Sequence, residues 1–382
     1  MRLIVSVLTL WLAWPAGSVP VVSHLSKLRA DGRRLVDESG RPFVWRGITG
    51  FRAVELVATG RATAADSFFA WARAQDASVV RVLTMSANLF RLAPDAGVAA
   101  LPKTLELAAR HGLYVEVVGL ADTASIQVDH RTHMRAVGAA CAARPNCLIE
   151  IANEPRHPTQ DSRVGDPAYL RELRSVVPRS VPVALGAAHG GDDESAEFAG
   201  GDYVTVHGNR ADDESPADPA DRAGWRWVGR IAAQRALSER TGKFVVNDEP
   251  RRDDLTAGKH LAVALLCRVM GVGDTFHYSG GLQADVATGA ELAALAARRR
   301  GWSAIPPDFS SSSREVGASD APVRSADSSA VVHVYSALRE RDGYVVAISG
   351  TATVPRVQWS DRWPKRQAVL SEHGVTLWKV SK

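Results

Sequence analysis

The sequence contains little cysteine, little excess charge of either sign, and no run beyond its N-terminus that is apolar enough to cross a membrane. Three cysteines in 382 residues allow few disulfides. A chain of this length can bury an apolar core large enough to stabilise the fold without disulfides or metals. Lys and Arg number 46 against 42 Asp and Glu, and the formal net charge of +4 is spread over the whole length. We therefore expect no basic patch and no nucleic-acid partner. The composition is that of neither a disordered chain nor a repeat array.

The N-terminus resembles a targeting segment. Arg2 precedes an apolar run from Leu3 to Trp14, and Ala16-Gly17-Ser18 is a small-residue cleavage site. An uncleaved membrane anchor is the alternative, but a run of about a dozen residues is too short to span a bilayer. We expect residues 1–18 to be a signal peptide. The mature protein is then secreted (extracellular or periplasmic), monomeric and without an integral membrane span.

The cysteines fit export without requiring it. Cys141 and Cys147 flank Ala-Ala-Arg-Pro-Asn, a turn that would let their side chains meet, and a disulfide between them suits an oxidising compartment. Cys267 lies in an apolar helical run and is expected to be a buried free thiol. The spacing matches no metal motif.

Short β-branched runs alternate with segments of helical periodicity along most of the chain. The expected strands span 43–48, 79–83, 114–118, 148–152, 182–185, 203–206, 244–246 and 273–278. The expected helices span 64–75, 98–111, 131–143, 167–176, 195–199, 225–241, 259–270 and 291–300. Eight such units predict an α/β fold, a (β/α)8 TIM barrel. A doubly wound open sheet is the alternative. It more often has five or six strands and a glycine-rich phosphate loop after the first, which Ile48-Thr49-Gly50-Phe51-Arg52 is not.

The barrel pattern ends after Trp302. Residues 306–330 begin with two prolines and are rich in Ser, Asp and Ala without apolar periodicity, which is typical of a linker. Strand-like runs recur in residues 331–382 and predict a small antiparallel β domain that packs on the barrel. The expected domains are thus 1–18, 19–305, 306–330 and 331–382. In the domain 19–305, a short hairpin is expected to precede the barrel strands.

Two expected strands end in a carboxylate followed by proline. Glu154 follows the fourth strand and Glu249 the seventh, about three βα units apart, so they would face each other across the barrel mouth. Opposed carboxylates suit glycosidic bond cleavage, in which one protonates the leaving oxygen and the other attacks the anomeric carbon or activates water. Two ordinary loop acids at helix starts are the alternative. Asp248 would replace Glu249 if Asp248 faced the lumen, because neighbours on a strand point to opposite faces.

Three strand motifs resemble glycoside hydrolase clan A. They are Val44-Trp45-Arg46-Gly47, Val80-Arg81-Val82 and Ile149-Glu150-Ile151-Ala152-Asn153-Glu154-Pro155. Within the clan, the cellulase family (family 5) is the most similar, and the likeness covers about residues 25–305. It implies Glu154 as acid/base and Glu249 as nucleophile. It also implies that Asn153 holds the sugar 2-hydroxyl, that Arg81 steadies the nucleophile, and that His207 is the family's strand-six histidine.

Several supporting positions depart from that family. The third strand, 115–119, lacks the usual histidine, and Asn209 stands where a tyrosine is expected. The tryptophan of strand eight is missing, with His277 and Tyr278 the nearest substitutes. Trp225, which follows a long loop after strand six, is a further candidate for stacking on a sugar ring.

The combined prediction is a secreted retaining glycoside hydrolase that acts on a β-linked oligosaccharide or polysaccharide. The histidines lack metal-ligand spacing, so no metal and no cofactor are expected. The alternative is a non-catalytic carbohydrate-binding or scaffold protein on a degenerate barrel, because the two glutamates are present while the residues around them differ from the family.

Overall fold

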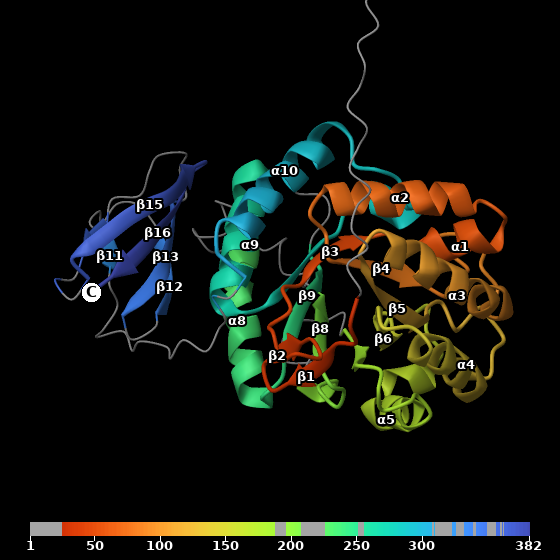
Figure 1. The fold of residues 1–382 in the computed structure, drawn as a ribbon. Coiled ribbons are helices and arrows are strands. Elements are labelled where there is room, and N and C mark those ends of the chain that lie inside the picture. Colours follow the sequence, from red (N-terminus) through yellow and green to blue (C-terminus); the bar gives the residue numbers. More distant parts are fainter. Residues whose placement is uncertain are drawn as a thin grey trace, which may run out of the picture.

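The structure is a computed structural model that describes residues 25–187, 196–207, 226–250, 256–307, 309, 323–325, 332–338, 341–349, 357–359, 361 and 363–382. It comprises an N-terminal hairpin, a barrel and a C-terminal β unit (Figure 1). The predicted signal peptide and Trp225 lie outside the described residues.

The barrel is a single sheet of eight strands joined by parallel pairs in the order β7-β6-β5-β4-β3-β10-β9-β8. The strands are β3 (Arg46–Thr49), β4 (Val79–Leu83), β5 (Tyr114–Leu120), β6 (Cys147–Ala152), β7 (Val183–Gly186), β8 (Val204–His207), β9 (Val245–Glu249) and β10 (Gly273–Phe276). At the seam between β7 and β8, the amide of Asp202 donates to the carbonyl of Val183 at 2.6 Å. The prediction of a (β/α)8 barrel is confirmed.

Helices surround this sheet. They are α1 (Ala53–Ala58), α2 (Ala62–Ala74), α3 (Pro94–Arg110), α4 (His130–Ala142), α5 (Pro167–Ser175), α8 (Arg226–Thr241), α9 (Ala257–Met270) and α10 (Gly289–Ser303), with 3-10 turns η1 (Ser162–Gly165) and η3 (Gly280–Gln283). Local signals set their ends. Asp129 and Asp166 cap α4 and α5 by accepting from backbone amides, and Gly271 ends α9 at φ 70°. The short helix α1 was not predicted.

The N-terminal end of the barrel is closed by an apolar floor. Leu28 and Leu35, from the hairpin of β1 (Arg29–Asp31) and β2 (Arg34–Val36), pack with Trp45 and with side chains of most barrel strands. The indole of Trp45 donates to Thr275 Oγ1 at 3.1 Å, so this tryptophan belongs to the floor. The first barrel strand starts later than predicted because Phe43 donates to the Leu35 carbonyl and thus pairs with the hairpin.

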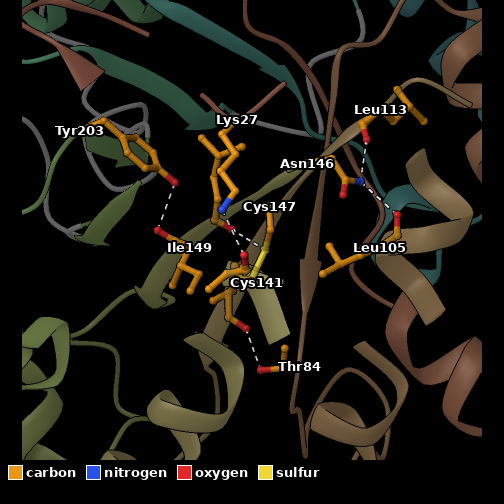
Figure 2. Close-up of a disulfide and its surroundings, with 12 residues drawn as sticks. Lys27, Thr84, Leu105, Leu113, Cys141, Asn146, Cys147, Ile149 and Tyr203 are labelled. Carbon is orange, nitrogen blue, oxygen red and sulfur yellow. Dashed lines mark hydrogen bonds between the residues drawn. A yellow bond between two sulfur atoms is a disulfide. The ribbon is translucent and has the colours of Figure 1, made fainter. Parts of the chain in front are cut away.

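A disulfide and a buried amide fix the start of β6, the strand that leads to Glu154. Cys141, near the end of α4, and Cys147, the first residue of β6, form the disulfide drawn in Figure 2. In the same view, Asn146 Nδ2 donates to the carbonyls of Leu105 and Leu113, both at 3.0 Å. Cys267 is a buried free thiol.

The C-terminal unit packs against α9 on the side of the barrel away from α3 and α4 (Figure 1). Its main sheet is antiparallel, in the order β12-β13-β16-β15, and β11 pairs with β14. These strands are β11 (Val323–Ser325), β12 (Val332–Leu338), β13 (Asp342–Ser349), β14 (Val357–Trp359), β15 (Lys365–Glu372) and β16 (Val375–Ser381). Tyr344, Val346 and Leu377 share one apolar cluster with α9. The segment expected to be a linker contains β11.

No helix in the described part of the chain has the length and apolarity that a membrane span requires.

Removing the disulfide should lower stability without changing the fold. In the combined variant Cys141→Ser, Cys147→Ser, the free energy of unfolding should fall by about 2 kcal/mol, because the crosslink restricts a short loop of the unfolded chain. Denaturant titration measures the change. Adding a reductant should destabilise the wild type and leave the variant unaffected, so equal midpoints for both proteins without reductant would contradict the prediction.

Candidate active site

Two glutamates and a histidine meet at the C-terminal end of the barrel. One carboxylate oxygen of Glu154, one of Glu249 and a ring nitrogen of His207 all lie within 4.8 Å of one another. The side chains of Glu154 and Glu249 are only 9% and 4% exposed. Glu154 has φ 41°, a left-handed conformation that costs about 1–3 kcal/mol for a residue with a side chain and that concentrates at functional sites.

His207 lies between the two carboxylates. Its Nδ1 is 3.3 Å from Glu154 Oε1, and its Nε2 is 3.7 Å from Glu249 Oε1. Burial alone lowers the pKa of His207, but the charge of Glu249 and hydrogen bonds outweigh burial and raise the pKa to about 10. At neutral pH the ring is therefore a cation, and its Nδ1–H donates to Glu154.

Arg81, on β4, holds the other side of Glu249. Its Nη1 donates to Glu249 Oε1 at 2.5 Å, and its Nη2 donates to Asn153 Oδ1 at 3.0 Å. The guanidinium also lies 5.1 Å from the centre of the Phe51 ring. Because the Arg81 side chain is only 1% exposed, these contacts persist with little screening by solvent.

The two residues predicted at the end of β10 have different surroundings. His277 Nδ1 is 3.0 Å from Thr49 Oγ1, and its Nε2 is 3.8 Å from Glu249 Oε2, so His277 belongs to the site. Tyr278 does not. Its ring packs between Trp71 and Phe276, and its hydroxyl donates to the carbonyl of Asp285 at 2.5 Å. The proposed role of Tyr278 in substrate binding is thus corrected, because its side chain is fully buried in the helix layer.

Glu150 and Glu116 form a layer of acids beside Arg81 in the barrel interior. Neither was predicted from the sequence to be a functional residue. Glu150 Oε2 accepts from Arg81 Nη2 at 2.5 Å and from Nε at 3.0 Å. Glu116 Oε2 is 3.7 Å from Arg81 Nε, and Glu116 Oε1 accepts from the Tyr203 hydroxyl at 2.8 Å. Burial, followed by the charges of nearby acids, raises the pKa of Glu116 well above its usual range, and burial also raises that of Glu150.

A sequence signal for this layer existed. Glu116 and Glu150 are single acids in the middle of otherwise apolar strands. They alternate with Val115, Val117, Ile149 and Ile151, which belong to the core cluster packed against the helices. An acid on the lumen side of a buried strand needs a polar or charged partner, and Arg81 lies next to both of these acids.

Asp248 and Glu249 both turn toward Arg81, although they are neighbours on one strand. Asp248 Oδ2 lies 2.6 Å from Arg81 Nε, and Asp248 is fully buried. The pairing of β8 with β9 steps from Val206↔Asn247 to His207↔Glu249, so Asp248 is the extra residue of a β-bulge. The strict alternation expected for these two neighbours does not hold here, because the bulge turns both carboxylates toward Arg81.

One of the basic residues at the rim is already paired. Arg156 Nη2 is 2.5 Å from Glu197 Oε2, and its guanidinium lies over the Phe198 ring. Three further arginines that follow expected strand ends in the sequence, Arg210, Arg251 and Arg252, lie outside the described residues.

By distance alone, two groups of described residues could hold a metal ion. They are Glu150, His207 and Asp248, and Glu154, His207 and Glu249. Both share His207, whose raised pKa opposes metal binding because a metal needs the neutral ring. The charge of Arg81 beside both groups also opposes a second cation.

Comparison of structures finds proteins similar to this chain, whereas comparison of sequences finds none. No family model matches the chain, and no curated protein matches it either. Among solved structures, a glycoside hydrolase family 5 protein from Bacteroides vulgatus has 15% identity and a TM-score of 0.58, with 93% of this chain and 92% of that chain covered. Another, described as a glycoside hydrolase, has 12% identity and a TM-score of 0.59, with 94% and 97% covered. A family 5 mannosidase from Rhizomucor miehei has 12% identity and a TM-score of 0.51, with 67% and 86% covered. The chain therefore has the fold of these structures.

The buried acid Glu116 should make stability depend on pH. Because its pKa is raised in the folded state, folding above about pH 4.5 takes up a proton, and stability falls as pH rises. The variant Glu116→Gln keeps the shape and removes this proton uptake. Its melting temperature relative to wild type should therefore increase between pH 5 and pH 8, as measured by calorimetry. A difference in melting temperature that does not change with pH would show that Glu116 is ionised in the folded protein.

Proposed function

We propose that this chain is a glycoside hydrolase that cleaves a β-linked oligosaccharide or polysaccharide with retention of configuration. The observation that carries the proposal is the pair of carboxylates at the mouth, with oxygens of Glu154 and Glu249 within 4.8 Å. Retaining enzymes hold their two carboxyl groups about 5–5.5 Å apart, whereas inverting enzymes need about 6.5–9.5 Å to admit a water.

The surroundings of the two acids assign their roles. Glu249 is the nucleophile, because the Arg81 cation donates to its Oε1 and favours the ionised carboxylate, while His277 Nε2 lies 3.8 Å from its Oε2. Glu154 is the acid/base, whose Oε1 is held by His207. Asn153, oriented through its Oδ1 by Arg81, is placed to bind the 2-hydroxyl of the sugar.

The reaction then proceeds in two displacements. A carboxylate oxygen of Glu249 attacks the anomeric carbon while the bond to the leaving oxygen breaks, and that oxygen takes the proton of Glu154. In the second step, Glu154 removes a proton from water, the water oxygen attacks the anomeric carbon, and Glu249 is released as a carboxylate. The arginine and histidine cations around Glu249 keep their positions in both steps, so little reorganisation is needed.

We also propose that the protein is exported. The N-terminal segment of the sequence and the buried Cys141–Cys147 disulfide support this location, because structural disulfides persist in oxidising compartments.

Replacing each glutamate should separate the two roles. Glu154→Gln should lower kcat/KM on natural glycans by about 10²- to 10⁴-fold. The loss of kcat/KM in this variant should be much smaller on dinitrophenyl β-glycosides, because their leaving group needs no proton. Glu249→Gln should abolish turnover of both substrates.

Glu106→Gln, on the exposed surface of α3, is the matched control and should behave as wild type. A panel of aryl β-glycosides and polysaccharides measures these rates. Binding of a glycan by wild type without hydrolysis of any member of the panel would instead identify a carbohydrate-binding protein.

Proton NMR of the reaction mixture tests the stereochemistry. The first product formed should be the β-anomer, because two displacements at one carbon restore the starting configuration. Initial release of the α-anomer would exclude the retaining mechanism even if both glutamates proved essential.

A further inference from the structure

We propose that Asp248 is a positioning residue, the permanent counter-ion of Arg81 and His207 while the charge of Glu249 is consumed and restored during the reaction. The role in turnover rests on the proposed function above. The counter-ion role itself concerns three buried side chains and can be measured without any substrate.

The location of Asp248 fits this role. The bulge in β9 turns its carboxylate into the barrel interior, where it is fully buried. Its Oδ2 lies 2.6 Å from Arg81 Nε and 3.8 Å from His207 Nε2, so one carboxylate adjoins both cations of the site. Among the charges that raise the pKa of Arg81 against the effect of burial, that of Asp248 is the largest.

Charged groups face His207 from three other strands of the barrel. They are Arg81 on β4, Glu150 and Glu154 on and after β6, and Asp248 and Glu249 on β9. Arg81 Nη2 is 3.5 Å from His207 Nε2, a contact between two cations that is repulsive without carboxylates beside it. The carboxylates on β6 and β9 therefore decide whether His207 stays charged.

Of these carboxylates, Glu249 cannot serve throughout the reaction. When it bonds to the anomeric carbon it becomes an ester and loses its negative charge, and it regains that charge when water releases the sugar. Glu154 changes its protonation state in the same steps. A counter-ion that keeps Arg81 and His207 together in every state must therefore take no part in the bond changes.

Glu150 and Glu116 are less suited to that role. Glu150 is a counter-ion of Arg81 alone, because its Oε2 accepts twice from Arg81 while its Oε1 accepts from Thr205 Oγ1 at 2.9 Å and from the Ala187 amide at 3.1 Å. Glu116 accepts from the Tyr203 hydroxyl and lies farther from Arg81, at 3.7 Å, and burial with the charges of nearby acids raises its pKa and so disfavours its charged form. Asp248 is the remaining carboxylate that lies beside both cations and takes no part in the bond changes.

The first experiment is a pH titration of the histidine rings by NMR on protein with labelled histidine, with the His207 signal assigned from the variant His207→Gln. In wild type, His207 should stay protonated until about pH 10. In Asp248→Asn, its midpoint should fall by about one pH unit or more, a tenfold loss of proton affinity. Glu116→Gln is the matched control in the same buried layer, and it should leave the midpoint nearly unchanged because the groups that set the pKa of His207 are Glu249, Asp248, Glu154 and Arg81.

The second experiment follows turnover of a dinitrophenyl β-glycoside, for which hydrolysis of the glycosyl-enzyme limits kcat. The alkaline limb of kcat against pH should move to lower pH in Asp248→Asn by the same shift as the His207 midpoint, with kcat near that of wild type at pH 7 and roughly fivefold lower at pH 10 for a shift of one unit. Glu116→Gln should keep the wild-type profile. A loss of kcat in Asp248→Asn that is the same at every pH would mean only structural damage and would overturn the proposal.

The outcomes separate the two proposals. If wild type hydrolyses no glycoside, the proposed function fails, while the NMR titration still decides the counter-ion role. If His207 of wild type loses its proton near pH 6.5, or if Asp248→Asn and Glu116→Gln shift its midpoint equally, Asp248 is not the counter-ion, whatever the activity. The wild-type titration gives this answer even if Asp248→Asn does not fold.

Discussion

The guanidinium of Arg81 is the group on which the rest of the site depends. It is buried inside the barrel, where an unpaired charge would be strongly destabilising, so the chain surrounds it with carboxylates from several strands. Because the fork of an arginine is planar and always charged, each partner is held in a defined direction. Arg81 thereby links the acids inside the barrel to Glu249 and Asn153 at its mouth.

The barrel interior is consequently built in three levels. Apolar side chains, including Trp45 and Val79, close the N-terminal end together with the hairpin. Above them lies the charged layer around Arg81, and above that lies the mouth with the two glutamates. A barrel interior filled by side chains is a rigid platform, and residues at the strand ends inherit that rigidity. The Cys141–Cys147 disulfide fixes the start of β6. The left-handed backbone of Glu154 lies in the loop that follows the other end of the same strand.

Much of this arrangement could be predicted from the sequence. The alternation of strands and helices predicts the barrel, and strand ends place Glu154, Glu249, Arg81 and His207 near one another because parallel strands share one C-terminal edge. Asp248 could not be placed, because strict alternation fails at a β-bulge and the sequence carries no visible sign of one. Tyr278 was misplaced for a related reason. It lies two residues beyond the end of β10, where alternation no longer fixes the direction of a side chain.

The sequence by itself determined the fold class, the strand ends that carry the site and the chemical types gathered there. These properties follow from the periodicity of apolar residues and from local turn chemistry, which are features of neighbouring residues. Only the tertiary structure decided which acids form ion pairs with Arg81, Asp248 and Glu249 among them. It also decided that His207 lies between two carboxylates. Those facts depend on the register between β8 and β9 and on burial from all sides. Burial also sets the proton affinities of His207 and Glu116, because a charge removed from water responds to every neighbour around it.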